Sequence, residues 1–541
     1  MRETIRQEGL VDQGMLRGIR IAIFDEFGEN GELAEEIALI AEQLGAKHPA
    51  PYLGPSDEWD FMAVLGDSKI PEIPEERSTD FRRVMLLEDG LRLTTREEPS
   101  SGEPSKLQRR GLCTIASSLF WQEAIRMKGT MLPVEIPKRY VEVSLRFNPK
   151  SAPGMNPQDF SLVDSRGREI SSVEMIDRED GTGHWVARAR LEPGSQLADS
   201  LLDSLRLEPR GPIRPPEPSE IEFRIPRQDE GVSGSALIAG AGGLGSWAIH
   251  ALCGGLSESG SDGSGLRVIV IDPDLEVERH NLNRQVLYSE SDIGRPKATC
   301  AAERIHEILP GAEVSHYVDA LGMMHLEALE MKLPPHVDRC PIAVEEVDLP
   351  MGTSAPKSPV TTTSSLPTNF PARYSLGGDV REIFSSVDVA LACVDNLRAR
   401  SLLSAMSAKS EIPMINAGAQ GFNGLLDVFL PDKSCMLCRH GKNAVRRNTR
   451  MSCQEDGEVP FSTIVTSTAI FGALQGLAMM AALTESDRIN SWPTQVRWAG
   501  RRNSFSLVAD QSFGVFSGSF ESQGGHYQHL EENLVDSTGG G

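Results

Sequence analysis

The sequence predicts an α/β protein whose largest part is a doubly wound parallel sheet. From residue 234 onward, short apolar runs alternate with helical patterns, as expected of parallel strands joined by helices. The first apolar run leads directly into the glycine-rich stretch GAGGLG (240–245) and then into a helical pattern. A second apolar run, GLRVIVI (265–271), ends at Asp272. A strand, a glycine turn, a helix and a second strand with an acidic end are the usual opening of such a sheet.

The chain is long enough for several domains, because 541 residues exceed the size of one ordinary domain. We predict a mixed α/β domain over residues 1–135 and a small β domain over 136–225, where strand-like alternation is broken by turn formers. A Rossmann-like domain follows over 226–500, with a loop insertion rich in Ser, Thr and Pro at 345–380. Residues 501–541 are expected to form a C-terminal strand and tail.

Within the first domain, the pattern predicts individual elements. The run IRIAIF (19–24) is typical of a buried strand, and residues 32–45 have helical spacing that ends at Gly45. The largely apolar run over residues 112–129 predicts a second, buried helix. Residues 72–106 are charged and rich in Pro and Ser, which favours loops.

Composition excludes several classes of protein. The net charge of -23 argues against broad binding to nucleic acid, which needs a basic surface. Two apolar stretches, 236–256 and 464–483, are rich in small residues and lack basic flanks, so we interpret them as buried elements and expect no membrane binding. The N-terminus has no secretory pattern, and eight scattered cysteines do not form a disulfide framework. We therefore expect a cytoplasmic protein.

The glycine turn predicts a nucleotide site. The spacing of Gly240, Gly242 and Gly245 is GxGxxG, and glycines there let backbone N–H groups and a helix N-terminus approach phosphate oxygens. Asp272, at the end of the next strand, can accept hydrogen bonds from ribose hydroxyls. These features alone fit NAD, FAD, S-adenosylmethionine and ATP about equally.

The following motifs narrow the choice of nucleotide. They are DPDLEVERHNLNRQ (272–285), DIGRPK (292–297) and an aspartate, Asp395, within DVALACVDNLRAR (388–400). In this order, after the glycine turn, they resemble the ThiF/MoeB/ubiquitin-activating (E1-like) superfamily over about residues 236–485. The resemblance implies an ATP site made of Gly240, Gly242, Gly243, Gly245, Asp272, Asp274, Asn281, Arg284, Gln285, Lys297 and Asp395.

The chemistry of adenylation needs residues of these types. A carboxylate that attacks the α-phosphorus of ATP approaches a polyanion, so cations must offset the repulsion. Arg284 and Lys297 suit triphosphate oxygens, and Asn281 can orient phosphate or the attacking carboxylate. Asp395 can bind Mg²⁺ through a hard oxygen. A hydride-transfer enzyme needs none of these cations. We therefore assign catalytic roles to Asn281, Arg284 and Asp395.

The cysteines suggest two further sites. Cys435 and Cys438 have the spacing of half a zinc site, but no cysteine follows Cys453, so we expect zinc to be absent. In the ubiquitin-type relatives, a cysteine at the place of Cys453 takes the acyl group as a thioester. Neighbouring arginines such as Arg446 would favour its thiolate. We assign Cys453 as the catalytic nucleophile, with a structural or zinc role as the alternative.

The resemblance implies that ATP adenylates the C-terminal glycine of a ubiquitin-like protein, followed by thioester formation on Cys453 and transfer to a conjugating enzyme. The layout of the front half is similar to activating enzymes of bacterial ubiquitin-like conjugation operons, some of which serve antiviral defence. The alternatives are adenylation of a sulfur-carrier protein without a thioester and a non-catalytic scaffold. The family also uses an arginine from a partner subunit or second copy of the fold. We therefore expect a homodimer, or an internal pseudo-dimer in which residues 1–135 are a degenerate, inactive half.

Overall fold

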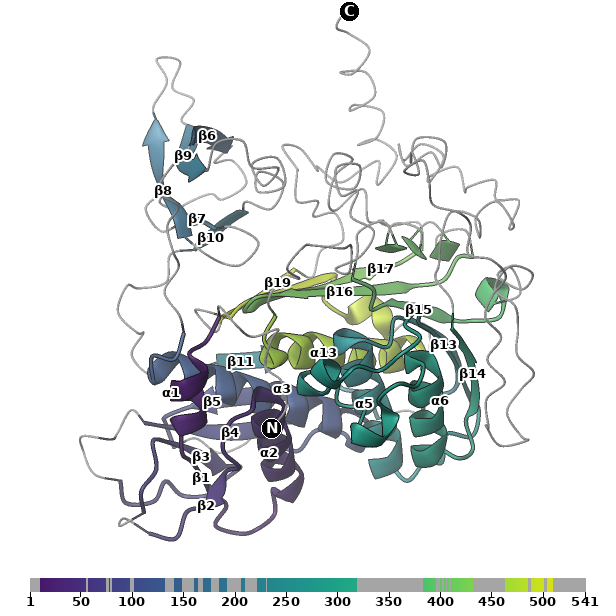
Figure 1. Cartoon of the computed structure of the whole chain (residues 1–541), viewed down its shortest axis with the longest axis horizontal. Coiled ribbons are helices and arrows are strands. Elements are labelled where there is room, and N and C mark those ends of the chain that lie inside the picture. The colour runs from purple at the N-terminus through teal and green to yellow at the C-terminus, as the bar shows by residue number, and fades with distance from the viewer. Residues whose placement is uncertain are drawn as a thin grey trace, which may run out of the picture.

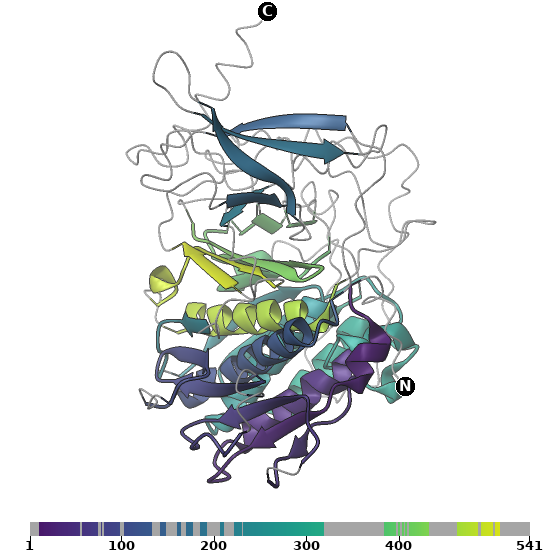
Figure 2. The same cartoon turned by 90° about the vertical axis from the view of Figure 1, so that its left-hand side faces the viewer.

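The computed structural model describes most of residues 10–131, 221–318, 383–431 and 463–500, with short gaps. It also gives the backbone of six further strands, at residues 141–147, 160–163, 169–176, 184–191, 206–209 and 504–508. Three sheets are present in these parts of the chain. Figures 1 and 2 show them from two directions.

The first sheet has six strands in the order β11-β5-β4-β3-β1-β2. Strands β2, β1, β3 and β4 run parallel, whereas β5 and β11 are antiparallel to their neighbours. The strands are β1 (Ile21–Phe24), β2 (Ala50–Pro51), β3 (Phe61–Leu65), β4 (Phe81–Leu87), β5 (Gly90–Thr94) and β11 (Ile221–Arg224). A short helix, α1 (Gln13–Gly18), precedes β1. Residues 221–224, which the sequence placed in the β domain, therefore belong to this sheet.

Two predictions for this region are confirmed and one is wrong. Strand β1 lies within 19–24, and helix α2 (Gly31–Leu44) ends at Gly45, whose φ of 71° is left-handed. The loop predicted for 72–106 instead contains β4 and β5. Charge misled the prediction, because Arg82 is a buried strand residue whose guanidinium pairs with Glu123 at 3.3 Å.

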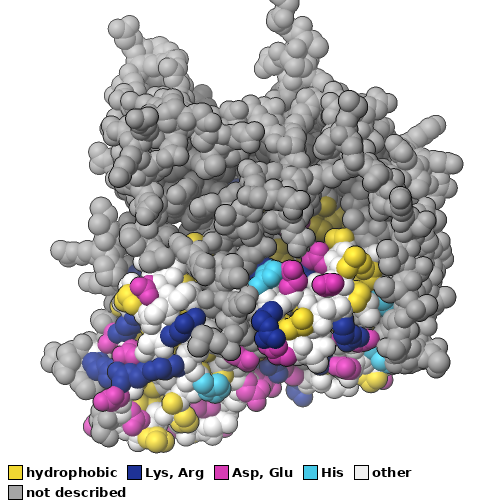
Figure 3. Space-filling model, in the orientation of Figure 1, with side chains coloured by type: hydrophobic (Ala, Val, Ile, Leu, Met, Phe, Trp, Pro, Cys, Tyr) yellow, Lys and Arg dark blue, Asp and Glu magenta, His cyan; other side chains and the backbone are white. Residues whose placement is uncertain are grey.

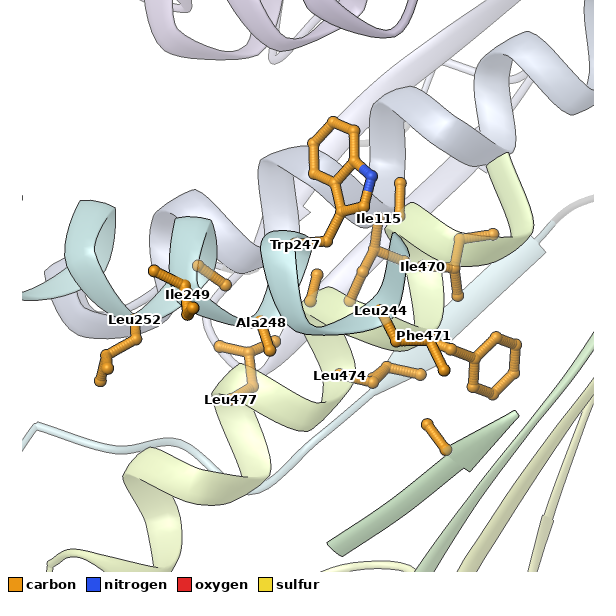
Figure 4. Close-up of a cluster of buried hydrophobic side chains, with 14 of the residues drawn as sticks. Ile115, Leu244, Trp247, Ala248, Ile249, Leu252, Ile470, Phe471, Leu474 and Leu477 are labelled. Carbon is orange, nitrogen blue, oxygen red and sulfur yellow. The ribbon is translucent and has the colours of Figure 1, made fainter. Parts of the chain in front are cut away.

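Helix α3 (Lys106–Met127) joins the first sheet to the rest of the molecule. Ser105 caps its N-terminus by accepting a hydrogen bond from the backbone N–H of Gln108, and nearly every residue from Leu107 to Ile125 is buried. The helix packs against α2 on one side and against α5 (Gly243–Glu258) and α13 (Val465–Ala482) on the other. Figure 4 shows the shared apolar cluster, which includes Ile115 of α3, Trp247 of α5 and Leu474 of α13.

A buried ionic network strengthens the same junction. Glu36 of α2 accepts hydrogen bonds from Arg110 of α3 at 2.9 Å, and its carboxylate also contacts His250 of α5 at 2.7 Å. Arg110 reaches Glu258 of α5 at 2.6 Å. Burial raises the pKa of the Glu36 carboxyl, but the charges and hydrogen bonds of His250 and Arg110 outweigh it and leave that pKa below its ordinary value. The N-terminal sheet is thus tied to α5 by charge as well as by apolar packing.

The largest sheet has eight strands in the order β14-β13-β12-β15-β16-β17-β18-β19. The strands from β14 to β16 are parallel, and β17, β18 and β19 extend the sheet in antiparallel pairs. They are β12 (Gly234–Ala239), β13 (Leu266–Ile271), β14 (Glu313–Tyr317), β15 (Val389–Ala392), β16 (Met414–Gln420), β17 (Asn423–Phe429), β18 (Gln495–Ala499) and β19 (Ser504–Val508). The chain moves one way from β12 to β14 and the other way from β15 to β16. The predicted doubly wound sheet is confirmed.

Both faces of this sheet are covered. Ala236 and Ile238 of β12 join the core under α5, α13 and α6 (Lys297–Ile308), whereas Leu237 and Ala239 join a second core on the opposite face. By length and composition α13 resembles a membrane span, but 94% of its apolar window is buried inside the protein. The interpretation of 464–483 as a core element is therefore confirmed.

The third sheet has five antiparallel strands in the order β10-β7-β8-β9-β6. They are β6 (Val141–Phe147), β7 (Phe160–Val163), β8 (Glu169–Ile176), β9 (His184–Leu191) and β10 (Arg206–Pro209). All of them fall in the range predicted to form the small β domain.

The close approach of α3 to α5 predicts a stability defect. A Cβ added at Gly255 would lie 2.1 Å from the carbonyl oxygen of Leu107. We expect Gly255→Val to lower the free energy of unfolding by about 1–3 kcal/mol or more, because overpacking must push the helices apart. Urea unfolding would measure this. Gly31→Val is the matched control, since a Cβ there meets nothing within 4 Å. A Gly255→Val protein as stable as the control would contradict the close packing.

Candidate nucleotide site

The candidate site lies where the strand order of the large sheet reverses, between β12 and β15. Ligands of doubly wound sheets bind at this point, beyond the carboxyl ends of the strands. The glycine turn follows β12, Asp272 follows β13, and Asp395 lies just beyond β15. The topology therefore gathers residues that are up to 155 positions apart in the sequence, from 240 to 395.

The glycine turn packs against the backbone that follows β15. Gly240 has a φ of 95°, and a Cβ there would lie 2.7 Å from the carbonyl oxygen of Cys393. A Cβ at Gly245 would lie 2.0 Å from the carbonyl oxygen of Gly240, so the helix can start this close to the strand only with glycine. At Gly242, the nearest atom to an added Cβ is the Nε2 of Gln285 at 3.9 Å. Within the described part of the chain, no other atom, apart from those of the residues next to Gly242, lies within 4 Å of that point, so the N-terminus of α5 has room for an anion.

The carboxylate of Asp272 bonds to the backbone of the glycine turn. It accepts hydrogen bonds from the backbone N–H of Ala241 at 2.6 Å and from that of Asp274 at 2.9 Å. Burial, and to a smaller degree the charge of Asp274, raises its pKa to about 6, although Lys297 acts in the opposite direction. Asp272 is therefore a buried carboxylate that titrates close to neutral pH.

A short 3-10 helix, Arg279–Asn283, follows β13; it contains the predicted asparagine, Asn281, and the predicted arginine, Arg284, comes directly after it. The Asn281 side-chain oxygen accepts a hydrogen bond from the backbone N–H of Glu278 at 3.0 Å, so this group shapes the turn. Arg284 donates to the carbonyl oxygen of His280 at 3.1 Å, and its own carbonyl accepts from the indole of Trp247 at 3.0 Å. Both residues are thereby fixed beside the start of α5.

Gln285 and Lys297 complete the group beside the turn. The Oε1 atom of Gln285 is buried and has no hydrogen-bond partner among the described residues, which favours a ligand donor at this position. Lys297 is buried, and its ammonium forms an ion pair with the carboxylate of Asp274. A phosphate oxygen would compete with Asp274 for this ammonium.

Asp395 is exposed, unlike Asp272. It follows Cys393, whose backbone N–H still donates to the Ala239 carbonyl at 2.8 Å, and it lies beyond the last residue of β15. An exposed carboxylate beside a phosphate-binding turn fits a hard divalent cation such as Mg²⁺. Within the described residues, no cluster of three or more metal-ligating side chains occurs.

Some predicted residues lie outside the described part of the chain. Cys453, Cys435 and Cys438 are among them, as is Arg446. Their roles as nucleophile, as zinc ligands and as the basic neighbour of the nucleophile stay predictions. The four other cysteines with described side chains, Cys113, Cys253, Cys300 and Cys393, are all buried.

The structure also reveals residues that the sequence analysis did not single out. The Tyr288 hydroxyl donates to the carbonyl of Ala241 at 2.6 Å and to that of Lys297 at 3.4 Å, so it links the glycine turn to the lysine. Arg400 is a buried arginine whose guanidinium bonds to the backbone next to Asp395. The sequence holds one sign of Arg400, namely that it lies five residues after Asp395, a candidate metal ligand.

Together, the fold and the site define a nucleotide-binding protein of the doubly wound α/β class. Residues 222–334 and 360–512 match the model of the ThiF family. The chain carries a ThiF family domain, and so belongs with the enzymes of the ThiF/E1-like adenylyltransferase family. The family resemblance stated from the motifs is confirmed.

Characterised relatives have low identity to this chain. The sulfur carrier protein ThiS adenylyltransferase of Escherichia coli is 24% identical over 265 residues, which are 49% of this chain and 77% of that protein. The SAMP-activating enzyme E1 of Haloferax volcanii is 24% identical over 48% of this chain and 67% of its own length. The human ubiquitin-like modifier-activating enzyme 7 is 27% identical over 42% of this chain but only 16% of its own length.

Solved structures are more distant. The Escherichia coli MccB structure with ATP has 16% identity and a TM-score of 0.33, and covers 51% of this chain. This chain spans 62% of the length of that structure.

The titration of Asp272 predicts a pH dependence of nucleotide binding. When the pH falls through about 6, the carboxyl becomes protonated and loses the charge that strengthens its hydrogen bond from the backbone N–H of Ala241, so the glycine turn is held less firmly. We expect the ATP dissociation constant, measured by isothermal titration calorimetry, to rise by roughly tenfold, as for one charge-assisted hydrogen bond. Asp272→Asn should bind ATP weakly at neutral pH, with a flatter pH profile. A wild-type affinity that is constant across this range would refute the role of Asp272.

Proposed function

We propose that the chain adenylates the C-terminal carboxylate of a small protein ending in glycine, with ATP as the co-substrate. The supporting observation is the joint placement of the glycine turn, Asp272, Arg284, Lys297 and Asp395 around one strand reversal. The described residues fit ATP, because the N-terminus of α5 has room for an anion, and the buried Oε1 atom of Gln285 has no hydrogen-bond partner among the described residues. Asp395 would bind Mg²⁺, which would neutralise charge on the phosphates.

The reaction joins two anions. The substrate carboxylate attacks the α-phosphorus, a new carboxyl–phosphorus bond forms, and pyrophosphate leaves with the electron pair of the broken P–O bond. The backbone N–H groups at the start of α5 and the guanidinium of Arg284 can receive the charge on the phosphates. Lys297 can do the same once its ammonium is shared with a phosphate oxygen rather than with Asp274 alone.

Two versions of this function differ in the next step. In the first, the acyl group moves to Cys453 as a thioester and then to a conjugating enzyme, as activating enzymes of ubiquitin-like proteins do. In the second, a sulfur-carrier protein is adenylated and no thioester forms. The match to the ThiS adenylyltransferase covers 77% of that protein. This similarity supports the second version as much as the first.

The described surface agrees with a protein partner rather than a nucleic acid. In the view of Figure 3, basic and acidic side chains are interspersed over the described residues and form no broad basic face. The net charge of the whole chain is -23. A basic protein substrate would be attracted to such a surface at low salt.

Loss of the Asp395 carboxylate tests the adenylation step. We expect Asp395→Ala to lower ATP–pyrophosphate exchange, measured with a ubiquitin-like protein ending in Gly-Gly, by roughly 10²-fold or more, as for removal of one charge-stabilising group. The unfolding midpoint should change little, because the side chain is exposed. Glu313→Ala is the control and should exchange normally, because this exposed carboxylate lies at the amino end of the edge strand β14, away from the carboxyl ends where the site lies. Normal exchange in Asp395→Ala would remove Asp395 from the reaction.

Loss of the Cys453 thiol separates the two versions of the function. If the thioester forms, Cys453→Ala keeps the exchange reaction but loses an adduct with the ubiquitin-like protein that is sensitive to reductant on gels. Cys300→Ala is the control, because burial raises the pKa of the Cys300 thiol to about 12 and keeps it protonated. An adduct that persists in Cys453→Ala would move the nucleophile elsewhere, and the absence of any adduct in the wild type would favour sulfur-carrier adenylation.

A further inference from the structure

Arg400 is buried beside the candidate metal ligand and bonds to two strand ends. Only 8% of its surface is exposed. Its guanidinium donates to the carbonyl oxygen of Val394, to the side-chain oxygen of Asn416 and to the carbonyl oxygen of Ala417. The first of these acceptors belongs to the residue directly before Asp395, and the other two belong to β16.

The guanidinium of Arg400 bonds to the backbone of Val394, which lies beyond the strand pairing of β15. The parallel pairing of β15 with β12 and with β16 stops at Ala392. Cys393 makes one more bond, to the carbonyl of Ala239 at 2.8 Å. The guanidinium of Arg400 donates to the carbonyl oxygen of Val394, and so fixes the chain directly before Asp395.

The charge of Arg400 is balanced by a buried chain of polar groups. Asn416 donates to Asp427 at 3.2 Å, and Gln495 donates to the other oxygen of the same carboxylate at 2.7 Å. Asp427 is completely buried in β17. Because each member bonds to its neighbours, the network is rigid and connects β17 and β18 to the edge of the site.

We propose that Arg400 is a positioning residue for the metal and nucleotide site, acting through Asp395. It cannot touch ATP from its buried place, but it sets where the Asp395 carboxylate lies relative to the glycine turn. A planar guanidinium serves three acceptors in fixed directions, which an ammonium does not do. This inference rests on the proposed function and adds to it a residue outside the shell that contacts ATP.

The test compares nucleotide binding with and without Mg²⁺ in the full-length protein. Calorimetric titrations with ATP in EDTA and with ATP in Mg²⁺ give the enhancement of affinity by the metal. In Arg400→Lys we expect ATP binding in EDTA to stay within about twofold of wild type, and the Mg²⁺ enhancement to fall by roughly tenfold or more, as for loss of a residue that orients a metal ligand. Exchange should show a lower kcat with a smaller change in the KM for ATP.

A double variant decides whether Arg400 acts through Asp395. If it does, Arg400→Lys combined with Asp395→Ala shows the same Mg²⁺ enhancement as Asp395→Ala alone. Arg83→Lys is the matched control, because Arg83 is also buried and bonds to a carbonyl, that of Ser68, far from the site. It should lose stability without losing Mg²⁺ enhancement. If Arg400→Lys fails to fold, Asn416→Ser removes one guanidinium partner and should reduce the enhancement in the same direction.

Three results would overturn the proposal. They are an unchanged Mg²⁺ enhancement in a folded Arg400→Lys or Asn416→Ser protein, effects that add in the double variant, and an equal loss in Arg83→Lys. If the wild-type protein binds no ATP in either condition, the proposed function fails first and the inference fails with it. A wild type that binds Mg²⁺·ATP while the double variant is additive overturns this inference alone.

Discussion

The contact between the glycine turn and the backbone after β15 is the constraint on which the site depends. Gly240 approaches the carbonyl of Cys393 so closely that a side chain there would clash. The strand order places β12 beside β15, and the close approach of Gly240 then lets the start of α5 lie near the backbone that leads to Asp395. A methyl group at that point would separate the helix N-terminus from the carboxylate, and the two halves of the candidate site would no longer face one ligand.

The candidate site contains carboxylates as well as the cations that would bind phosphate. Asp272 is buried under the turn and has a pKa raised to about 6, and Lys297 is paired with Asp274. Arg284 is held by carbonyl and amide oxygens. The cations are therefore placed in advance, and under the proposed function phosphate oxygens would compete with these partners for them. Asp272 orients the turn, and under the proposed function Arg284 and Lys297 would receive the charge of the phosphates.

The residues that the sequence singled out at the centre of the site do lie close together in the structure, because most of them are near one another in the sequence; their roles stay predictions. The glycine spacing, Asp272 and the segment from Asn281 to Lys297 all lie close to one strand–turn–helix, and local sequence fixes how they fold. Tyr288, which bonds to Ala241, and the buried Arg400 were missed because their roles depend on carbonyl groups of other elements.

The strands β4 and β5 were missed for a related reason. Arg82 and Arg83 of β4 are charged in the sequence but are buried against Glu123 and Ser68 in the fold, and Arg92 of β5 pairs with Glu222 of β11. Helix α3 was found as an apolar helix, but its place between α2, α5 and α13 was not deducible from spacing.

The central claim is that this strand reversal binds ATP, and a competition titration tests it most directly. Purified full-length protein would be titrated with ATP in the presence of Mg²⁺, and separately with NAD, by isothermal titration calorimetry. We expect ATP to bind one site per chain and an excess of NAD to leave that binding unchanged. Binding of NAD in place of ATP, or no binding of ATP at all, would contradict the assignment of the site.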